Sequence, residues 1–248
     1  MIFQPPPTTP YDLQFTLFGF PVRIHPLFWL IALLFGLPAA HILDAVIWVV
    51  VVLVSITLHE LGHAFAMRMY GQEASIVLYY AGGLAIPEGG GWVRSRLEPP
   101  QQIVISFAGP LAGFITAGVV VALVMGLGGL VDVRFMAGFI PVPSAFLPLA
   151  GRFGNTFIRM MLWVNVFWGL INLLPVFPLD GGRIAQQILL MADPWEGVRK
   201  SLWVSVVTGA IAALLGLVLL GSLYIALLFG YLAFQSYRML QGRMGAMY

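Results

Sequence analysis

The 248-residue chain contains no cysteine and few charged residues. The absence of cysteine excludes disulfide bonds and metal sites built from thiolates. Charged side chains make up only 9% of the residues, whereas a soluble domain usually carries about 25%. Hydrophobic residues make up 60%, so we expect an integral membrane protein with little soluble mass. The net charge of +2 is too small to indicate a nucleic-acid partner.

Long apolar runs predict about six transmembrane helices in a single membrane-embedded domain over residues 1–248. In chain order, these runs occupy 26–38, 45–69, 101–128, 156–174, 202–220 and 222–240. The last two form a predicted helical hairpin that turns at Gly221. The expected fold class is an all-α polytopic membrane protein with small membrane-associated β-hairpin elements.

The β-hairpin elements are predicted at two places that are rich in branched and aromatic residues. One covers residues 13–24, with its turn at Gly19-Phe20-Pro21. The other covers residues 73–86, which are interrupted by Gly82-Gly83. A proline- and phenylalanine-rich connection at 131–153 is expected to lie in the membrane interface. Residues 1–12 are expected to be a mobile tail and not a signal peptide, because the first ten contain four prolines and no basic residue.

The basic residues indicate the orientation in the membrane. If the chain crosses the membrane six times, both termini lie on one side. The basic residues on that side are Arg23, Arg68, Arg94, Arg96, Arg183, Arg199, Lys200, Arg238 and Arg243. The opposite side receives Arg134, Arg152 and Arg159. Because cytoplasmic loops carry the excess of lysine and arginine, both termini are predicted to be cytoplasmic.

The sequence His59-Glu60-Leu61-Gly62-His63 lies inside one of these apolar runs. Residues four apart share a face of a helix, so both imidazoles can reach one metal ion. Glu60 lies beside them, where a carboxylate can take a proton from a metal-activated water. Ionisable groups are costly at membrane depth, which favours a functional site. The alternative is a buried polar patch that holds helices together.

A catalytic zinc site needs a third protein ligand. His41 is predicted on the opposite side of the membrane, and His25 precedes Pro26, where it is expected to cap a helix or mark the interface. Asp180 follows two prolines, Pro175 and Pro178, which break the fourth apolar helix. Irregular backbone at this depth must be buried in protein or line a cavity. Asp180 is therefore interpreted as either a metal ligand or a helix N-cap.

Together these motifs resemble the site-2 protease family of intramembrane zinc metalloproteases. The resemblance rests on His59-Glu60-x-x-His63, on Phe107-Ala108-Gly109-Pro110-Leu111-Ala112-Gly113, on Arg23-Ile24-His25-Pro26 and on Asn172-x-x-Pro175-x-x-Pro178-x-Asp180-Gly181-Gly182. It covers nearly all of the chain. It implies Zn²⁺ bound by His59, His63 and Asp180. It also implies Glu60 as the general base and Asn172 as a contact to the substrate backbone.

The expected activity is hydrolysis of a peptide bond within or near the transmembrane segment of a membrane protein. The PDZ and CBS modules of some family members have no counterpart in this sequence. A transporter or proton relay could use the same buried polar residues, and a non-catalytic homologue could shelter membrane helices. Many transporters are built from two repeated halves, and no such repeat is visible in this sequence. A non-catalytic homologue would be expected to have lost Glu60 or a metal ligand, and this chain retains them.

Overall fold

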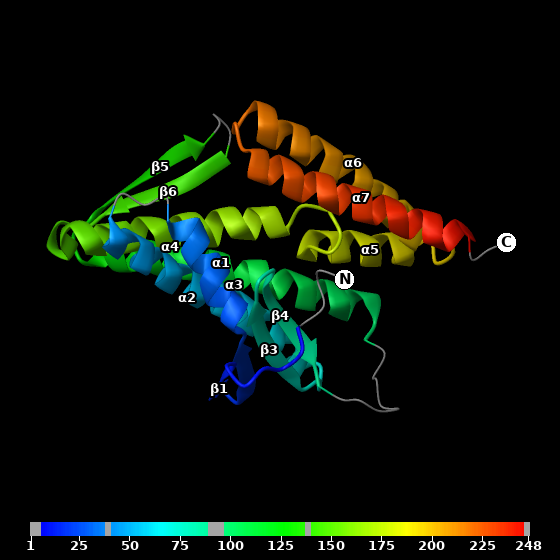
Figure 1. Ribbon diagram of the computed structural model, residues 1–248, viewed down its shortest axis with the longest axis horizontal. Coiled ribbons are helices and arrows are strands. Elements are labelled where there is room, and N and C mark those ends of the chain that lie inside the picture. Colours follow the sequence, from blue (N-terminus) through cyan, green and yellow to red (C-terminus); the bar gives the residue numbers. More distant parts are fainter. Residues whose placement is uncertain (1–5, 38–40, 89–96, 137–139, 246–248) are drawn as a thin grey trace. The chain divides into compact units, whose positions relative to one another are not determined.

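A computed structural model describes residues 6–37, 41–88, 97–136 and 140–245 (Figure 1). The chain forms two compact units, and each is described by itself. The first unit comprises Met1–Arg96 and Ala108–Gly169, and the second comprises Leu97–Phe107 and Leu170–Tyr248. The extent of a single functional domain over 1–248 stays a prediction.

Apart from α5, the helices follow the predicted apolar runs. They are α1 (Pro26–Gly36), α2 (Ile42–Met69), α3 (Pro99–Gly126) and α4 (Gly151–Asn172), followed by α5 (Asp180–Ala192), α6 (Gly197–Val218) and α7 (Leu223–Gly245). In the described residues, three of them are long and apolar enough to cross a membrane, namely α2, α3 and α6. The protein is therefore mostly helical and membrane-embedded, and the number of six spans stays a prediction.

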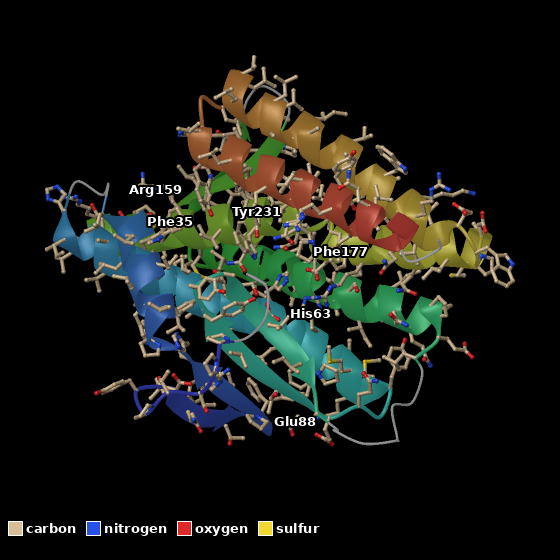
Figure 2. All side chains as sticks on the ribbon, turned by 45° about the vertical axis from the view of Figure 1, so that its right-hand side comes forward. Phe35, His63, Glu88, Arg159, Phe177 and Tyr231 are labelled. Carbon is tan, nitrogen blue, oxygen red and sulfur yellow. The ribbon has the colours of Figure 1, made fainter. Side chains whose placement is uncertain are left out.

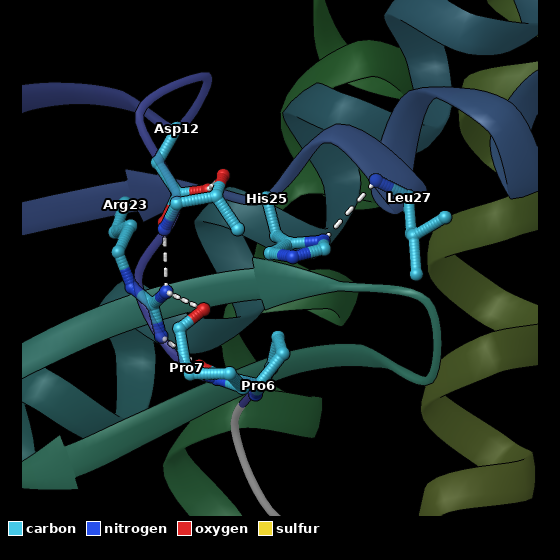
Figure 3. A network of polar contacts seen from close by, with 7 residues as sticks. Pro6, Pro7, Asp12, Arg23, His25 and Leu27 are labelled. Atoms are coloured by element: carbon cyan, nitrogen blue, oxygen red, sulfur yellow. Dashed lines mark hydrogen bonds and ion pairs between the residues drawn. The ribbon is translucent and has the colours of Figure 1, made fainter.

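The beginning of α1 shows how a local signal sets a helix boundary. His25 is the N-cap residue in extended conformation, and its Nδ1 accepts a hydrogen bond from the backbone N–H of Leu27 at 3.2 Å (Figure 3). Pro26 occupies the first helical position, where its missing N–H has no helical partner to lose. The predicted cap at His25 is confirmed.

A four-stranded sheet belongs to the first unit. Its strands are β1 (Leu13–Leu17), β2 (Phe20–Ile24), β3 (Ala74–Tyr79) and β4 (Gly82–Pro87), in the order β1-β2-β3-β4. The predicted hairpin over 13–24 is confirmed, although its turn consists of Phe18 and Gly19, both with positive φ, and not of Gly19-Phe20-Pro21. Arg68, near the end of α2, stacks on the ring of Phe20 at 3.5 Å and donates to the carbonyl of Phe18.

The second predicted hairpin, over 73–86, is also present as β3 and β4, which pair in antiparallel fashion. Its turn lies at Tyr80 and Ala81, so Gly82 and Gly83 belong to β4 and do not form the turn. Gly83 lies against the side chain of Glu60, where a larger residue would collide.

The connection predicted at 131–153 contains structure that the prolines concealed. Leu130–Met136 (β5) and Ile140–Phe146 (β6) form a two-stranded antiparallel ribbon, followed by the short 3-10 helix Pro148–Ala150. Proline within an apolar run argues against a strand, but it is tolerated where a strand has a free edge. In this ribbon Pro141 and Pro143 lie opposite Phe135 and Val133.

The N-terminal segment contacts β2 where the structure describes it, from residue 6 onward. The Arg23 guanidinium forms an ion pair with Asp12 at 2.8 Å and donates to the carbonyls of Pro6 and Pro7 (Figure 3). Burial raises the pKa of Asp12, but hydrogen bonds from Thr9 and Arg23 outweigh it and lower that pKa to about 2. Residues 1–5 of the predicted tail lie outside the described residues.

The second unit consists mainly of α5, α6 and α7. Helices α6 and α7 lie side by side as an antiparallel hairpin, and the predicted turn at Gly221 is confirmed by its φ of +60° (Figure 1). A Cβ at Gly216 would stand 2.5 Å from a methyl carbon of Ile225, so glycine permits this close approach. Helix α5 was not predicted, because its 13 residues are too short and too polar to read as a membrane segment.

Candidate metal centre

Two imidazoles converge on one face of α2. The Nε2 atoms of His59 and His63 lie 3.2 Å apart, and the side chains are buried (His63 is labelled in Figure 2). A tetrahedral zinc ion with Zn–N bonds of about 2.0–2.1 Å separates two nitrogen ligands by about 3.3 Å. The spacing of the two nitrogens therefore fits a shared zinc ion.

Glycines on α2 and α3 make room for this arrangement. A Cβ at Gly109 would lie inside van der Waals contact of His63 Nε2 and 2.8 Å from His59 Nε2. A Cβ at Gly62 would overlap the carbonyl of Ala108 and stand 2.9 Å from the Cβ of Ala112. The α3 backbone is thus held against the imidazole face of α2, which excludes any side chain at position 109.

Glu60 is buried and meets the sheet. A Cβ at Gly83 would stand 2.5 Å from both Cγ and Oε1 of Glu60, and 2.7 Å from a methyl carbon of Ile56. Strand β4 is an edge strand of the sheet, and the face of Gly83 lies against the carboxylate. This neighbourhood combines a buried carboxylate with backbone groups that can pair with an extended peptide.

Asp180 belongs to the second unit, where it is the first residue of α5 and is buried. The N-cap residue is Leu179, so the interpretation of Asp180 as an N-cap is wrong. A carboxylate in the first turn is favourable because the helix dipole is positive there. The break predicted around Pro175 and Pro178 is confirmed, since α4 ends at Asn172 and α5 begins at Asp180.

Close backbone contacts hold the segment between α4 and α5 in place. A Cβ at Gly181 would overlap the carbonyl of Leu173, and one at Gly182 would stand 2.5 Å from the backbone nitrogen of Phe177. The N–H of Phe177 donates to the Ser205 hydroxyl on α6 at 3.0 Å. The two glycines therefore allow the chain to fold back on itself beside Asp180.

Asn172, predicted to contact the substrate, is the last residue of α4 and is buried. It ends the helix just before the irregular segment that presents Asp180. Two other residues were not predicted as parts of the site, namely Gly83 and Gly109. Only Gly109 carried a signal, as part of the Ala108-Gly109-Pro110 run, and its contact with the imidazoles depends on tertiary structure.

The chain is similar to several known proteins. The profile of Peptidase family M50 matches residues 47–216, which include most of α2, β3, β4 and the segment leading to Asp180. The zinc metalloprotease MJ0392 of Methanocaldococcus jannaschii is 28% identical over 179 residues, which are 71% of this chain. They are 44% of that relative, so the chain spans less than half the length of the curated protein that it matches.

The fold has a counterpart of known structure. The site-2 protease from Methanocaldococcus jannaschii superimposes with a TM-score of 0.57 over 93% of this chain and 95% of that chain, at 23% sequence identity. At this identity the likeness shows a common fold. The family match covers more than half of the residues, including the His59–His63 pair. The chain therefore belongs to peptidase family M50.

Proposed function

We propose that this protein is an intramembrane zinc metalloprotease that hydrolyses a peptide bond within or near the transmembrane segment of a membrane protein. One observation carries the proposal. Two buried imidazoles, 3.2 Å apart, lie on a helix long and apolar enough to cross a membrane. Such a costly placement of ionisable groups is expected only where they serve a site.

Asp180 is the proposed third ligand beside His59 and His63. The proposed donor set combines the His59–His63 pair of α2 with the buried carboxylate of Asp180. Two imidazoles and one carboxylate are a common donor set for catalytic zinc. When bound, zinc supplies Lewis-acid activation of a water molecule and of the scissile carbonyl.

Glu60 and Asn172 are the proposed catalytic partners. Glu60 takes the proton of the attacking water and delivers it to the leaving amine, as a general base and then a general acid. The amide of Asn172 donates a hydrogen bond to the oxygen on which negative charge develops. Both side chains are buried, and burial strengthens these interactions.

The substrate is proposed to bind as an extended strand along β4. A transmembrane helix hides its peptide bonds in its own hydrogen bonds, so the scissile segment must unwind before cleavage. The outer edge of β4 can then pair with it, in a strand whose Gly83 lies against Glu60. The competing interpretation is that β3 and β4 only cover the site.

The lipid bilayer and a membrane-protein substrate are the proposed partners, with no role for nucleic acid. We place both termini in the cytoplasm and count six membrane segments. The distribution of arginine and lysine supports this orientation. The number of spans is supported by the lengths of α4 and α7, which are 22 and 23 residues.

The test combines zinc analysis with cleavage of a model transmembrane substrate in detergent. The wild-type protein should contain about one zinc ion per chain, and His59→Ala, His63→Ala and Asp180→Ala should lose it. Glu60→Gln should retain zinc and the fold but lose cleavage, because an amide cannot accept the water proton. Full zinc occupancy in Asp180→Ala would exclude it as a ligand. A wild-type protein that binds zinc but cleaves nothing would instead favour the non-catalytic homologue. A wild-type protein that binds no zinc would favour the transporter.

A further inference from the structure

Asn165 is a buried polar residue in the middle of α4, with 3% of its surface exposed. It is one of only three asparagines in the chain, the others being Asn155 and Asn172. The proposed catalytic steps do not use it. Amides are rare and costly among apolar helices unless their hydrogen bonds are satisfied, so this side chain needs an explanation.

The amide nitrogen of Asn165 is satisfied, whereas its oxygen is not. Nδ2 donates to the Ser55 hydroxyl at 2.9 Å and to the carbonyl oxygen of Met161 at 2.8 Å. Oδ1 is fully buried and has no hydrogen-bond partner among the described residues. Exchanging the two amide atoms would place an oxygen against the Met161 carbonyl, which cannot donate, so the orientation is determined.

A second polar atom beside Asn165 is only weakly used. The Ser55 hydroxyl accepts from Asn165, and its own donor contact is the thioether sulfur of Met161 at 3.8 Å. Thioether sulfur is a weak acceptor. A small molecule that donates to Asn165 Oδ1 and accepts from the Ser55 hydroxyl would satisfy both groups.

Gly113 of α3 leaves room next to this pair. A Cβ at Gly113 would stand 3.2 Å from the backbone carbonyl oxygen of Asn165 and 3.7 Å from its Oδ1. With glycine at this position, that volume beside the unpartnered oxygen is free of side-chain atoms. The polar groups at this place suit a water molecule, which needs two or more polar partners.

The location of this cluster connects it to the imidazoles. Ser55 lies four residues before His59 on α2, and Gly113 lies four residues after Gly109 on α3. On both helices the cluster is therefore one turn, about 6 Å along the axis, from the residues that form the imidazole pocket. Asn165 is therefore packed against the parts of α2 and α3 that lie one helical turn from the imidazoles.

The opposite side of the cluster is closed by apolar side chains. Val51 lies one turn before Ser55 and is 0% exposed, and it forms an apolar cluster with Met161 and Val164. Further apolar residues surround these three, among them Ile47, Val54 and Phe157. Water cannot cross this layer readily, so exchange with the Asn165 cluster must occur on the imidazole side.

We propose that Asn165 Oδ1 and Ser55 Oγ bind a buried water molecule that exchanges with the metal centre and not with the far side of the membrane. A water at this position would be a reserve for a reaction that consumes one water per cleavage. The link to hydrolysis rests on the proposed function, whereas the water site itself does not.

Water-edited solid-state NMR of the protein in lipid tests the site directly. Asparagine labelled with ¹³C and ¹⁵N gives three side-chain signals, and Asn165→Leu and Asn155→Leu assign two of them. Asn155 is the matched reference, because it is buried on the same helix and protein groups satisfy both its amide atoms. Polarisation from water should reach the side-chain amide carbon of Asn165 faster than it reaches the side-chain amide carbon of Asn155. Transfer that is no faster at Asn165 would overturn the proposal.

The connection with hydrolysis has its own measurement. Asn165→Leu, which keeps the branched shape and removes the polar atoms, should retain zinc and cleave a model substrate roughly five- to tenfold more slowly, the effect of one hydrogen bond. An equal rate per bound zinc would overturn the assignment of this water to the reaction. If the wild type cleaves nothing, the proposed function fails, and the NMR measurement still decides the water site.

Discussion

The backbone of Gly109 lies against the imidazole of His63, so closely that a single methyl group at position 109 would overlap Nε2 of that ring. The contact joins α3 to the metal-binding face of α2. It makes the spacing of the two imidazoles depend on a residue that has no side chain of its own.

Gly109→Ala should therefore displace His63 and His59 and abolish zinc binding. Gly118→Ala is the matched control on the same helix, because its Cβ would meet no atom within 4 Å. Alanine is favoured over glycine in a helix interior by about 1 kcal/mol, so the control should fold at least as well as the wild type. Zinc content per folded chain is the measurement, and equal zinc in both variants would contradict the assigned contact.

Gly83→Ala should retain zinc and slow cleavage. The added methyl would stand 2.5 Å from Glu60 Cγ and Oε1, so either the carboxylate or strand β4 must move. The three atoms nearest to the added methyl belong to Glu60 and Ile56 and not to an imidazole, so the zinc ligands should keep their ion. Zinc analysis and the initial rate on one substrate distinguish this outcome from unfolding. A wild-type rate would mean that the contact of β4 with Glu60 has no role in catalysis.

Asn172→Ala should leave zinc bound and reduce the cleavage rate by about 10²–10³, the usual loss when one oxyanion donor is removed. If Asn172 serves only to pack the end of α4, the variant should lower stability and spare the rate per folded molecule. Rates normalised to zinc content and thermal unfolding in detergent separate the two. Normal turnover would leave only the packing role.

The orientation in the membrane can be tested by cysteine labelling, since the native chain contains no cysteine. Ser144→Cys lies in β6 and Gln241→Cys lies in α7. An impermeant reagent added outside intact cells should label position 144 and not position 241. Labelling after membrane disruption provides the control for reactivity. The reverse pattern would overturn the predicted topology.

The ion pair between Asp12 and Arg23 should depend on pH in the acidic range. The pKa of Asp12 is lowered from 3.8 to about 2, so the folded segment is stabilised above pH 3.8 and loses this stabilisation as the pH falls through about 2. Arg23→Gln should move the pKa of Asp12 back toward 3.8. An NMR titration of the Asp12 carboxyl carbon measures this shift, and Arg152→Gln, on α4, should leave it unchanged.

The sequence by itself was sufficient for features set by neighbouring residues. The spacing of His59 and His63 places two ligands on one face of a helix, whatever surrounds it. Pro175 and Pro178 break a helix because they lack a backbone donor. The cap at His25 and the turn at Gly221 have similarly local causes. For these features, a window of a few residues contains all the relevant interactions.

Only the tertiary structure decided which backbones close around these ligands. The sequence predicted that Gly83 interrupts a strand. In the structure Gly83 lies within β4 and allows this strand to approach Glu60. The prolines of β6 argued against a strand in the sequence. In the structure they belong to a two-stranded ribbon, and proline is tolerated at its free edge. Asn165 gave no sequence signal, because its partner Ser55 is 110 residues away along the chain. Contacts at such separations depend on how helices pack, and packing is set by the volumes and polar groups of all neighbours together.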